Sequence, residues 1–282
     1  MANFPHTTFN NIKEISLNQD FVQDFSVKEK GIKLECRINQ KVKNDYLVVT
    51  PNGAVDREKY RLPVFARWNY QSIFNSSILS VSDPALLLDD ALRIGWFAGT
   101  NQLDIAQFVS EVVIKVADQL GIAHDRIIFW GSSSGGFASV LLASKINGSC
   151  FVSFNGQSTI NNYYAGHVED YRKVFDSQSS IGDILQSYPS RWSIITALDK
   201  SYKDGLSTKG VVVQNVIDEM HYLTHYTPFC EHFGLPLKGG KSNNYGLWSL
   251  LFEHQKGHGP ETAEIAKQVV KEYLPKILGE NK

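Results

Sequence analysis

Apolar positions recur along this chain with two different periods, and segments of the two kinds follow one another in turn. Residues 32–38 alternate apolar and polar side chains, which is typical of a half-buried strand. Short apolar runs, as expected of strands buried on both faces, occupy residues 46–50, 127–130, 150–154 and 211–214, and a further strand is predicted over 77–82. Helical spacing or small apolar residues predict helices over 104–120, 137–144 and 265–274.

Strands that alternate with helices in this order predict an α/β protein with a doubly wound, mostly parallel sheet and helices on both faces. Residues 12–50 are β-rich and predict an antiparallel edge that leads into a central strand. Residues 157–191 break the pattern with a polar, tyrosine-bearing stretch, which is either a functional insertion or an ordinary surface excursion. A chain of 282 residues fits one catalytic domain, residues 1–282.

The segment between the predicted strand 127–130 and the predicted helix 137–144 carries the clearest chemical signal. It contains Gly-Ser-Ser-Ser-Gly-Gly at residues 131–136, which matches the Gly-x-Ser-x-Gly turn that presents a nucleophilic serine. Ser133 is the predicted nucleophile because it alone has glycine at both required positions; Ser134 is the alternative. A purely structural turn is a second interpretation. A phosphate loop is disfavoured because no lysine follows Gly136.

Residues 125–136 resemble the Asp-x-x-Arg-Ile-x-x-x-Gly-x-Ser-x-Gly-Gly pattern of the α/β-hydrolases, with one residue fewer before the arginine. The resemblance implies an α/β-hydrolase-like fold and a catalytic acid and histidine that follow the serine in that order. It also places residues 157–191 where such proteins often insert a cap over the pocket.

An isolated serine hydroxyl is a poor nucleophile at neutral pH, so it needs a base and a carboxylate that orients that base. The base should lie between the last strand and the closing helix. His258 is the predicted base because its glycine neighbours permit a tight loop. His254, at the end of an apolar run, is the alternative.

The acid should follow a strand that precedes this histidine. Asp218 comes just after the apolar run 211–214, at the sheet edge where open α/β sheets place their sites. Glu219 is adjacent and is an alternative. Asp199 is another alternative, but Asp199 and Asp204 flank lysines in a segment typical of a solvated turn.

An oxyanion hole needs two backbone N–H donors. Ser134, which follows the predicted nucleophile, supplies one, and Gly53 or Ala54 in the loop after strand 46–50 is predicted to supply the other. A simple Asn-Gly turn is the competing interpretation of that loop. The His-Gly-Gly-Gly form of many lipases is missing from this sequence.

Three residues are predicted to contact substrate: Asn52, Trp96 and His221. Trp96 lies between glycines, and it either forms a pocket wall or belongs to the core, the commoner place for aromatic residues. His221 and His225, with Cys230 and His232 nearby, suggest a metal site, but their spacing fits no zinc motif. We therefore expect no metal, and histidines that line the pocket or bind the acid loop.

Composition and charge argue against nucleic-acid binding, a membrane span, secretion and disulfide bonds. The net charge of −1 gives no electrostatic basis for binding nucleic acid. No apolar stretch is long enough to span a bilayer, and the first residues lack the features of a secretion signal, so a cytoplasmic protein is expected. The three cysteines are Cys36, Cys150 and Cys230, and their wide spacing argues against disulfides. The oligomeric state is left open.

The predicted serine, histidine and aspartate indicate acyl transfer through an acyl-serine intermediate, with no cofactor. Short motifs at 52–54, 83–84, 95–99 and 214–221 are similar to those of serine hydrolase-like proteins associated with bacterial surface glycans, including the accessory-secretion and capsule O-acetyltransferase branches. This resemblance implies a carbohydrate hydroxyl or its acyl ester as substrate. The predicted function is an esterase that acts on an acylated carbohydrate or another small ester. One alternative is an O-acetyltransferase that moves acetyl from acetyl-CoA to a glycan hydroxyl. Another is a binding or scaffold protein without turnover.

Overall fold

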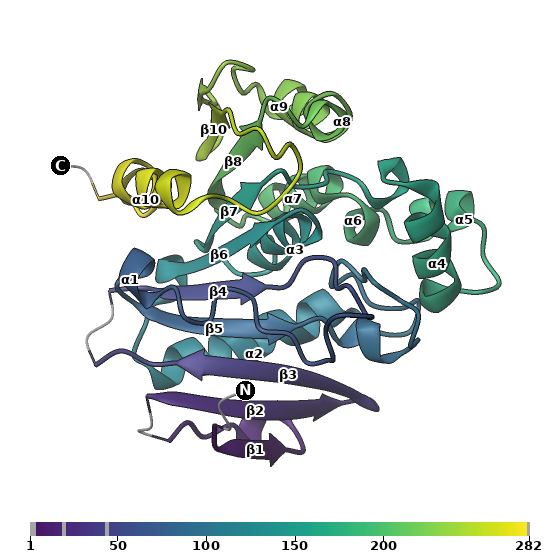
Figure 1. Cartoon of the computed structure of the whole chain (residues 1–282), viewed down its shortest axis with the longest axis vertical. Helices are drawn as coiled ribbons and strands as arrows, with labels where there is room; N and C mark the ends of the chain where they lie inside the picture. Colours follow the sequence, from purple (N-terminus) through teal and green to yellow (C-terminus); the bar gives the residue numbers. More distant parts are fainter. Residues whose placement is uncertain (1–3, 19–20, 43–44, 281–282) are drawn as a thin grey trace.

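The structure is a computed structural model that describes residues 4–18, 21–42 and 45–280. The predicted domain 1–282 and the predicted β-rich segment 12–50 therefore each include residues outside the described part: 1–3, 19–20, 43–44 and 281–282. The described residues form one ten-stranded sheet in the order β1-β2-β3-β5-β4-β6-β7-β8-β10-β9 (Figure 1). The strands are β1 (His6–Phe9), β2 (Val22–Glu29), β3 (Ile32–Asn39), β4 (Leu47–Pro51), β5 (Ser77–Ser82), β6 (Ile127–Ser132), β7 (Cys150–Phe154), β8 (Lys209–Asn215), β9 (Gly240–Lys241) and β10 (Leu247–Phe252).

The sheet is mostly parallel, as predicted. Every neighbouring pair from β5 through β4, β6, β7 and β8 to β10 runs parallel. β2 and β3 form the antiparallel region that leads into the sheet, and β3 pairs antiparallel with β5. The short edge strands β1 and β9 were not predicted, because His6–Phe9 is largely polar and Gly240–Lys241 has no apolar pattern.

Helices connect the strands. The α-helices are α1 (Gln71–Phe74), α2 (Ile105–Gln119), α3 (Ser134–Ala143), α4 (Ala165–Phe175), α5 (Ile181–Ser187), α6 (Pro189–Trp192), α7 (Ile194–Lys203), α8 (Glu219–His221), α9 (Thr227–Phe233), α10 (Ala263–Glu272) and α11 (Leu274–Ile277). The short 3-10 helices are η1 (Ile12–Glu14), η2 (Pro84–Leu87), η3 (His124–Arg126) and η4 (Ile160–Asn162), and η5 (Tyr222–Tyr226) is a π-helix. In the described residues, no helix combines the length and apolar character needed to cross a lipid bilayer.

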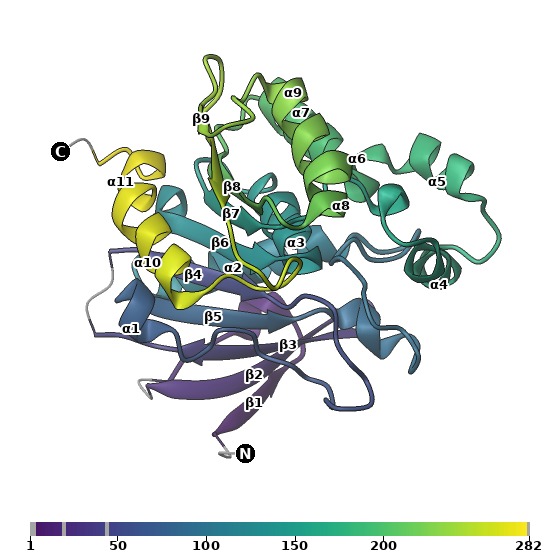
Figure 2. The same ribbon diagram turned by 45° about the horizontal axis from the view of Figure 1, so that its top comes forward.

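Two apolar layers cover the two faces of the sheet. On one face, α2 and α3 pack in a large cluster that includes Phe108, Val112 and Leu141. On the other face, α10 contributes Ile265 and Val269 to a smaller cluster with the strands and α11. Figure 2 shows α10 and α11 together, with α1 next to α10. Helices on both faces, and with them the predicted α/β fold class, are therefore confirmed.

Residues 157–191 contain η4, α4, α5 and all of α6 except its last residue, Trp192. In Figures 1 and 2, α4 and α5 lie beyond the sheet, on the side away from α10. Arg191 joins this segment to the loop before α2: its guanidinium donates to the carbonyl of Ala98 at 2.8 Å and to that of Leu103 at 2.8 Å. The segment is thus held against the loop that contains Trp96, but its function as a cap stays a prediction.

Asp83, just after β5, holds the turn that carries Trp96. Its two carboxylate oxygens accept hydrogen bonds from the backbone of Ala85 at 3.0 Å and of Phe97 at 2.8 Å. Trp96 and Phe97 both adopt left-handed backbone angles, with φ of 52° and 57°, which cost free energy unless the surroundings hold them. Burial raises the pKa of Asp83 to about 6, although the two backbone hydrogen bonds oppose this rise.

This carboxyl makes stability depend on pH. Between about pH 4 and pH 6 the folded chain keeps a proton on Asp83 that the unfolded chain has released, so the stabilisation is lost as pH rises through 6. Asp83→Asn cannot titrate. The difference in unfolding free energy, wild type minus Asp83→Asn, should therefore fall by about 2 kcal/mol between pH 4.5 and pH 7.5. Urea unfolding at both pH values measures it, and a difference that does not change with pH would contradict the assignment.

Candidate active site

Ser133 lies at the turn between β6 and α3. Its backbone angles, φ 56° and ψ −126°, are unfavourable for a residue with a side chain. The backbone N–H of Ser133 donates to the carbonyl of Phe154 at 2.9 Å, and its own carbonyl accepts from Gly136 and Phe137 in the first turn of α3. The turn is therefore fixed from both sides, by the neighbouring strand β7 and by the helix.

Two glycines make this turn possible. A Cβ on Gly131 would lie 2.1 Å from the carbonyl oxygen of Gly135, and a Cβ on Gly135 would lie 2.9 Å from that of Pro51. Both distances are far shorter than carbon and oxygen tolerate without a bond. The glycines thus allow β6, α3 and the loop after β4 to approach one another around Ser133.

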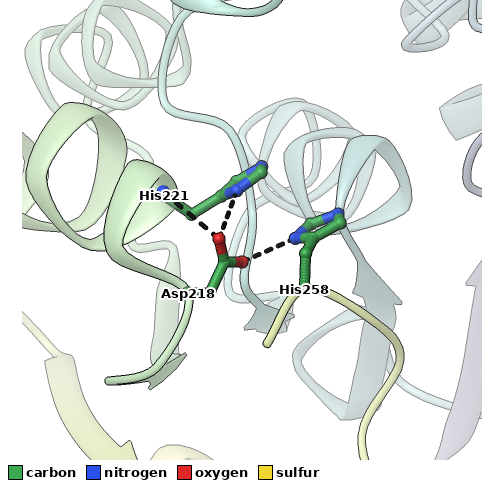
Figure 3. Close-up of side chains that lie close together, drawn as sticks. All are labelled: Asp218, His221 and His258. Atoms are coloured by element: carbon green, nitrogen blue, oxygen red, sulfur yellow. Dashed lines mark hydrogen bonds and ion pairs between the residues drawn. The ribbon is translucent and has the colours of Figure 1, made fainter. Parts of the chain in front are cut away.

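Three residues far apart in the sequence meet at this turn. His258 Nε2 lies 2.9 Å from Ser133 Oγ, and His258 Nδ1 lies 2.6 Å from Asp218 Oδ2. Figure 3 shows the carboxylate of Asp218 joined by dashed lines to both His258 and His221. The structure therefore brings together the three residues predicted as nucleophile, base and acid, in the relative positions that proton transfer from serine to imidazole requires.

Two asparagines hold the loop that carries His258. Asn215, the last residue of β8, donates through its side chain to the carbonyls of His254 and Gly257, both at 2.7 Å. Asn155, just after β7, donates to the carbonyl of Gly259 at 3.0 Å. Since both side chains come from the carboxyl ends of neighbouring parallel strands, the sheet itself sets the position of this loop. The structure places His258, rather than His254, against the serine.

Asp218 caps the short helix α8, and its carboxylate is almost fully buried. Burial by itself raises the pKa of Asp218, but the hydrogen bonds from His221 and His258 outweigh burial and hold the pKa well below its usual range. The carboxylate therefore stays ionised at neutral pH, as an acid that orients and stabilises an imidazolium must.

The alternative acids lie elsewhere. Glu219 is exposed at the start of α8. Asp199 pairs with His232 at 3.0 Å, and Asp204 pairs with Lys200. The interpretation of the Asp199 segment as a solvated turn was wrong, because α7 occupies it: its apolar residues pack against the core while its charged residues stay at the surface.

The predicted oxyanion donors lie near the serine. Ser134 is the first residue of α3, where backbone N–H groups have no acceptor within the helix. A Cβ on Gly53 would lie 3.3 Å from the carbonyl of Ser132, so the loop after β4 lies against the turn, and Ala54 beside it is exposed. Asn52 braces this loop: its side chain accepts from the N–H of Asp83 at 2.7 Å and donates to the carbonyl of Gly53. The oxyanion-hole role of Ser134, Gly53 and Ala54 stays a prediction, and so does the contact of Asn52 with substrate.

The other two residues predicted to contact substrate, Trp96 and His221, are each only 1% exposed. Trp96 Nε1 donates to Gln157 Oε1 at 3.2 Å, and His221 Nδ1 lies 3.0 Å from Asp218 Oδ1. Both are therefore buried within the hydrogen-bond network of the site, and contact with substrate stays a prediction for both.

Sequence reasoning missed Gln157, whose Nε2 lies 3.1 Å from Ser133 Oγ. The one available signal was its position just after strand 150–154, at the same sheet edge as Asp218. It was hidden because residue 157 was assigned to the start of the polar excursion.

A buried ion pair beside the site was also missed. Arg67 Nε donates to Glu261 Oε1 at 2.6 Å, and Trp130 of β6 donates to the same oxygen at 2.7 Å. Arg67 also donates to Ser132 Oγ at 2.8 Å. Burial tends to raise the pKa of Glu261, but the Arg67 guanidinium holds it below its usual value. Because Glu261 follows the His258 loop and Ser132 precedes Ser133, this pair links the base to the nucleophile turn.

Within the described residues, the donor atoms of Asp218, His221 and His258 lie within 4.8 Å of one another, close enough to hold a metal ion. Each of these atoms already has a partner, since the two imidazole Nδ1 atoms face the two oxygens of one carboxylate. Hydrogen bonds between the two imidazoles and the carboxylate thus account for the cluster. The metal set considered from the sequence does not assemble, because His232 pairs with Asp199 and Cys230 is buried in α9.

No protein-family model matches the chain, and no curated protein matches its sequence. Solved structures match in fold. The capsule O-acetyltransferase of Neisseria meningitidis serogroup A superposes with a TM-score of 0.62 at 17% identity, over 89% of this chain and 96% of that one. An S-formylglutathione hydrolase from Agrobacterium tumefaciens gives 0.60 at 12% identity, over 94% and 98%. The fold is α/β-hydrolase-like.

A third similar structure, the Glycosylation Associate Protein (Gap123) complex from Streptococcus agalactiae, has a TM-score of 0.62 at 12% identity and covers 90% of this chain. This chain spans about half of that one, 47%. At these identities the likeness concerns the α/β-hydrolase-like fold, which agrees with the fold predicted from the resemblance of residues 125–136.

The ion pair gives a test of how the site is held. Glu261→Gln leaves the buried Arg67 charge without a counter-charge, so we expect it to lower the unfolding free energy by about 3–5 kcal/mol. Glu280→Gln is the matched control, because it removes the carboxylate of the partly exposed pair with Arg126 and should cost less than about 1 kcal/mol. Denaturant unfolding of the wild type and both variants measures the two losses of unfolding free energy. Equal losses would show that the Arg67–Glu261 pair does not stabilise the fold.

Proposed function

We propose that this protein is an enzyme that transfers acyl groups through Ser133. The observation that carries the proposal is the chain of contacts at the turn: Ser133 Oγ to His258 Nε2 at 2.9 Å, and His258 Nδ1 to Asp218 Oδ2 at 2.6 Å. A hydroxyl hydrogen-bonded to an imidazole, which a buried carboxylate orients, is the arrangement that activates serine as a nucleophile.

In the proposed reaction, Ser133 Oγ attacks the carbonyl carbon of an ester while its proton passes to His258 Nε2. The negative oxygen of the tetrahedral intermediate is bound by the N–H of Ser134 and an N–H of Gly53 or Ala54. Collapse of the intermediate expels the alcohol, which takes the proton from His258, and leaves an acyl-serine. Water or another hydroxyl, deprotonated by His258, then attacks the acyl group and restores Ser133.

We favour an esterase that acts on an acylated carbohydrate or another small ester, without a cofactor or metal. Water is then the acceptor in the second step. Support comes from the fold shared with an S-formylglutathione hydrolase over nearly the whole of both chains. Asn52, Trp96 and His221 are the residues proposed to shape the substrate site. We further propose that the protein acts in the cytoplasm and binds no nucleic acid.

The second candidate is an O-acetyltransferase that uses acetyl-CoA and a glycan hydroxyl. The capsule O-acetyltransferase of Neisseria meningitidis serogroup A matches this chain across 96% of its own length, and the short motifs resemble the same group of proteins. The acyl-serine step is common to both reactions, and only the acceptor differs. A scaffold without turnover is the third candidate; the hydrogen-bonded serine, histidine and aspartate count against it, because a scaffold needs no such contacts.

A fluorophosphonate probe tests the nucleophile. The wild-type protein should become labelled, with the adduct mapped by peptide mass spectrometry to Ser133, because the probe reacts with serines activated by a neighbouring base. Ser133→Ala should abolish labelling, and His258→Ala should slow it by at least about 100-fold.

Circular dichroism and thermal melting of each variant serve as the folding control. An adduct on Ser134, or labelling that persists in folded Ser133→Ala, would contradict the assignment of the nucleophile. Unlabelled but folded wild-type protein would favour the scaffold.

The acceptor is tested by measuring release of p-nitrophenol from p-nitrophenyl acetate, with and without a glycan acceptor. If the protein is an esterase, water accepts the acyl group, so the glycan should not change the rate of p-nitrophenol release. EDTA should also leave this rate unaltered. Acetyl-CoA with the glycan gives the matched comparison. Transfer of acetyl to the glycan that outpaces hydrolysis would replace the esterase by the transferase.

A further inference from the structure

Asp218 serves two histidines at once. His258 Nδ1 faces one carboxylate oxygen at 2.6 Å, and His221 Nδ1 faces the other at 3.0 Å (Figure 3). The two rings are stacked, with centroids 4.0 Å apart and an interplanar angle of 12°. A serine–histidine–aspartate site needs one histidine, so the second requires its own explanation.

The second histidine leads back to the serine. His221 Nε2 lies 2.8 Å from Gln157 Nε2, and the same amide nitrogen lies 3.1 Å from Ser133 Oγ. Five side chains therefore form a closed ring, listed in order as Ser133, His258, Asp218, His221 and Gln157. Within this ring, the carboxylate can only accept hydrogen bonds and the amide nitrogen can only donate them.

Trp96 fixes the direction of the hydrogen bonds that Gln157 makes to His221 and Ser133. Its indole N–H can only donate, and it lies 3.2 Å from Gln157 Oε1, which orients the amide of Gln157. The amide nitrogen then has two hydrogens, one for His221 Nε2 and one for Ser133 Oγ. His221 Nε2 must accept, so the proton of His221 is on Nδ1, where it binds Asp218.

We propose that Gln157 and His221 are positioning residues for Ser133 and Asp218, and that His221 is held as a neutral imidazole with its proton on Nδ1. This inference rests on the proposed acyl transfer at Ser133. Gln157 holds the serine oxygen in the direction of His258, and His221 supplies the buried carboxylate with a second hydrogen-bond donor.

The neutral state of His221 matters for the reaction. His258 becomes positively charged each time it takes a proton from the serine or the acceptor, and His221 lies 4.0 Å away by ring centroids. A second positive charge there would oppose this step. Burial lowers the pKa of His221, and the donor on Gln157 faces the nitrogen that a second proton would occupy. His221 can thus support Asp218 without repelling the imidazolium.

Nitrogen-15 NMR of histidine-labelled protein tests the protonation state without any assay of activity. We expect His221 in the neutral form with its proton on Nδ1, and a downfield Nδ1–H signal that His221→Phe removes. Gln157→Leu should release this preference, because Nε2 then loses its donor. Finding His221 protonated on both nitrogens, or on Nε2 alone, in the wild-type protein would overturn the proposal.

Ester hydrolysis tests the positioning role. Gln157→Leu and His221→Phe should each lower kcat about tenfold and change KM less than about twofold. The reason is that both side chains make their hydrogen bonds within the ring, and His221, which is only 1% exposed, shapes the substrate site through that ring rather than by contact with the ester. If the two act through one ring, the double variant should lose little more than either single variant. The positioning role would be refuted if the kcat losses of the two single variants added fully in the double variant, or if kcat were unchanged in folded Gln157→Leu.

His225→Phe is the matched control. His225 is also a fully buried histidine near His221, but its Nδ1 faces the backbone N–H of Ser158 at 3.2 Å rather than Asp218. We expect this variant to lose stability while kcat stays within about twofold, which separates a general effect of losing a buried histidine from the positioning effect. Inactive wild-type protein would refute the proposed function, whereas the NMR result would still decide the state of His221.

Discussion

The left-handed backbone of Ser133 is the constraint on which the site depends. A residue with a side chain adopts such angles only where its surroundings over-determine them, and here a strand, a helix and a close loop do so together. β7 accepts the N–H of Ser133, the first turn of α3 binds its carbonyl, and Gly131 and Gly135 leave room for the backbone that passes next to them. The free energy of the whole sheet–helix packing thus offsets the cost of presenting one hydroxyl.

The same principle extends to the partners of Ser133, which reach it from the ends of parallel strands. Side chains at those ends hold the loops: Asn155 and Asn215 bind backbone carbonyls around His258, and Glu261 is tied through Arg67 to Ser132. Polar groups buried in this way are costly unless each is paired. Since these are paired with one another across the sheet edge, separating one element from the edge would leave buried donors and acceptors unsatisfied.

The sequence predicted the parts of this arrangement that local rules govern. Apolar runs identified the central strands, helical spacing identified α2 and α10, and the glycine pattern identified the turn at Ser133. Chain order narrowed the choice of base and acid; the glycine neighbours of His258 and the position of Asp218 just after the strand 211–214 then selected these two residues. Gln157 could not be found in this way, because its role arises from the adjacency of β7 to β6, which is set by tertiary pairing. The edge strands were missed for a related reason: β1 forms through pairing with β2, and its four residues are too few and too polar to show an apolar pattern.

The second histidine at Asp218 shows how local and long-range structure combine. Asp218 caps α8, and His221 is three residues further on in the same turn, so the helix start itself directs this imidazole toward the carboxylate. His258 comes from another part of the chain and meets the second oxygen. A buried carboxylate with no cation bound to it must be stabilised by donors. With His258 alone, the other oxygen would keep only the long hydrogen bond from the backbone N–H of His221, at 3.5 Å. The pattern Asp-x-x-His at a helix start therefore lets the acid stay both buried and ionised next to the serine.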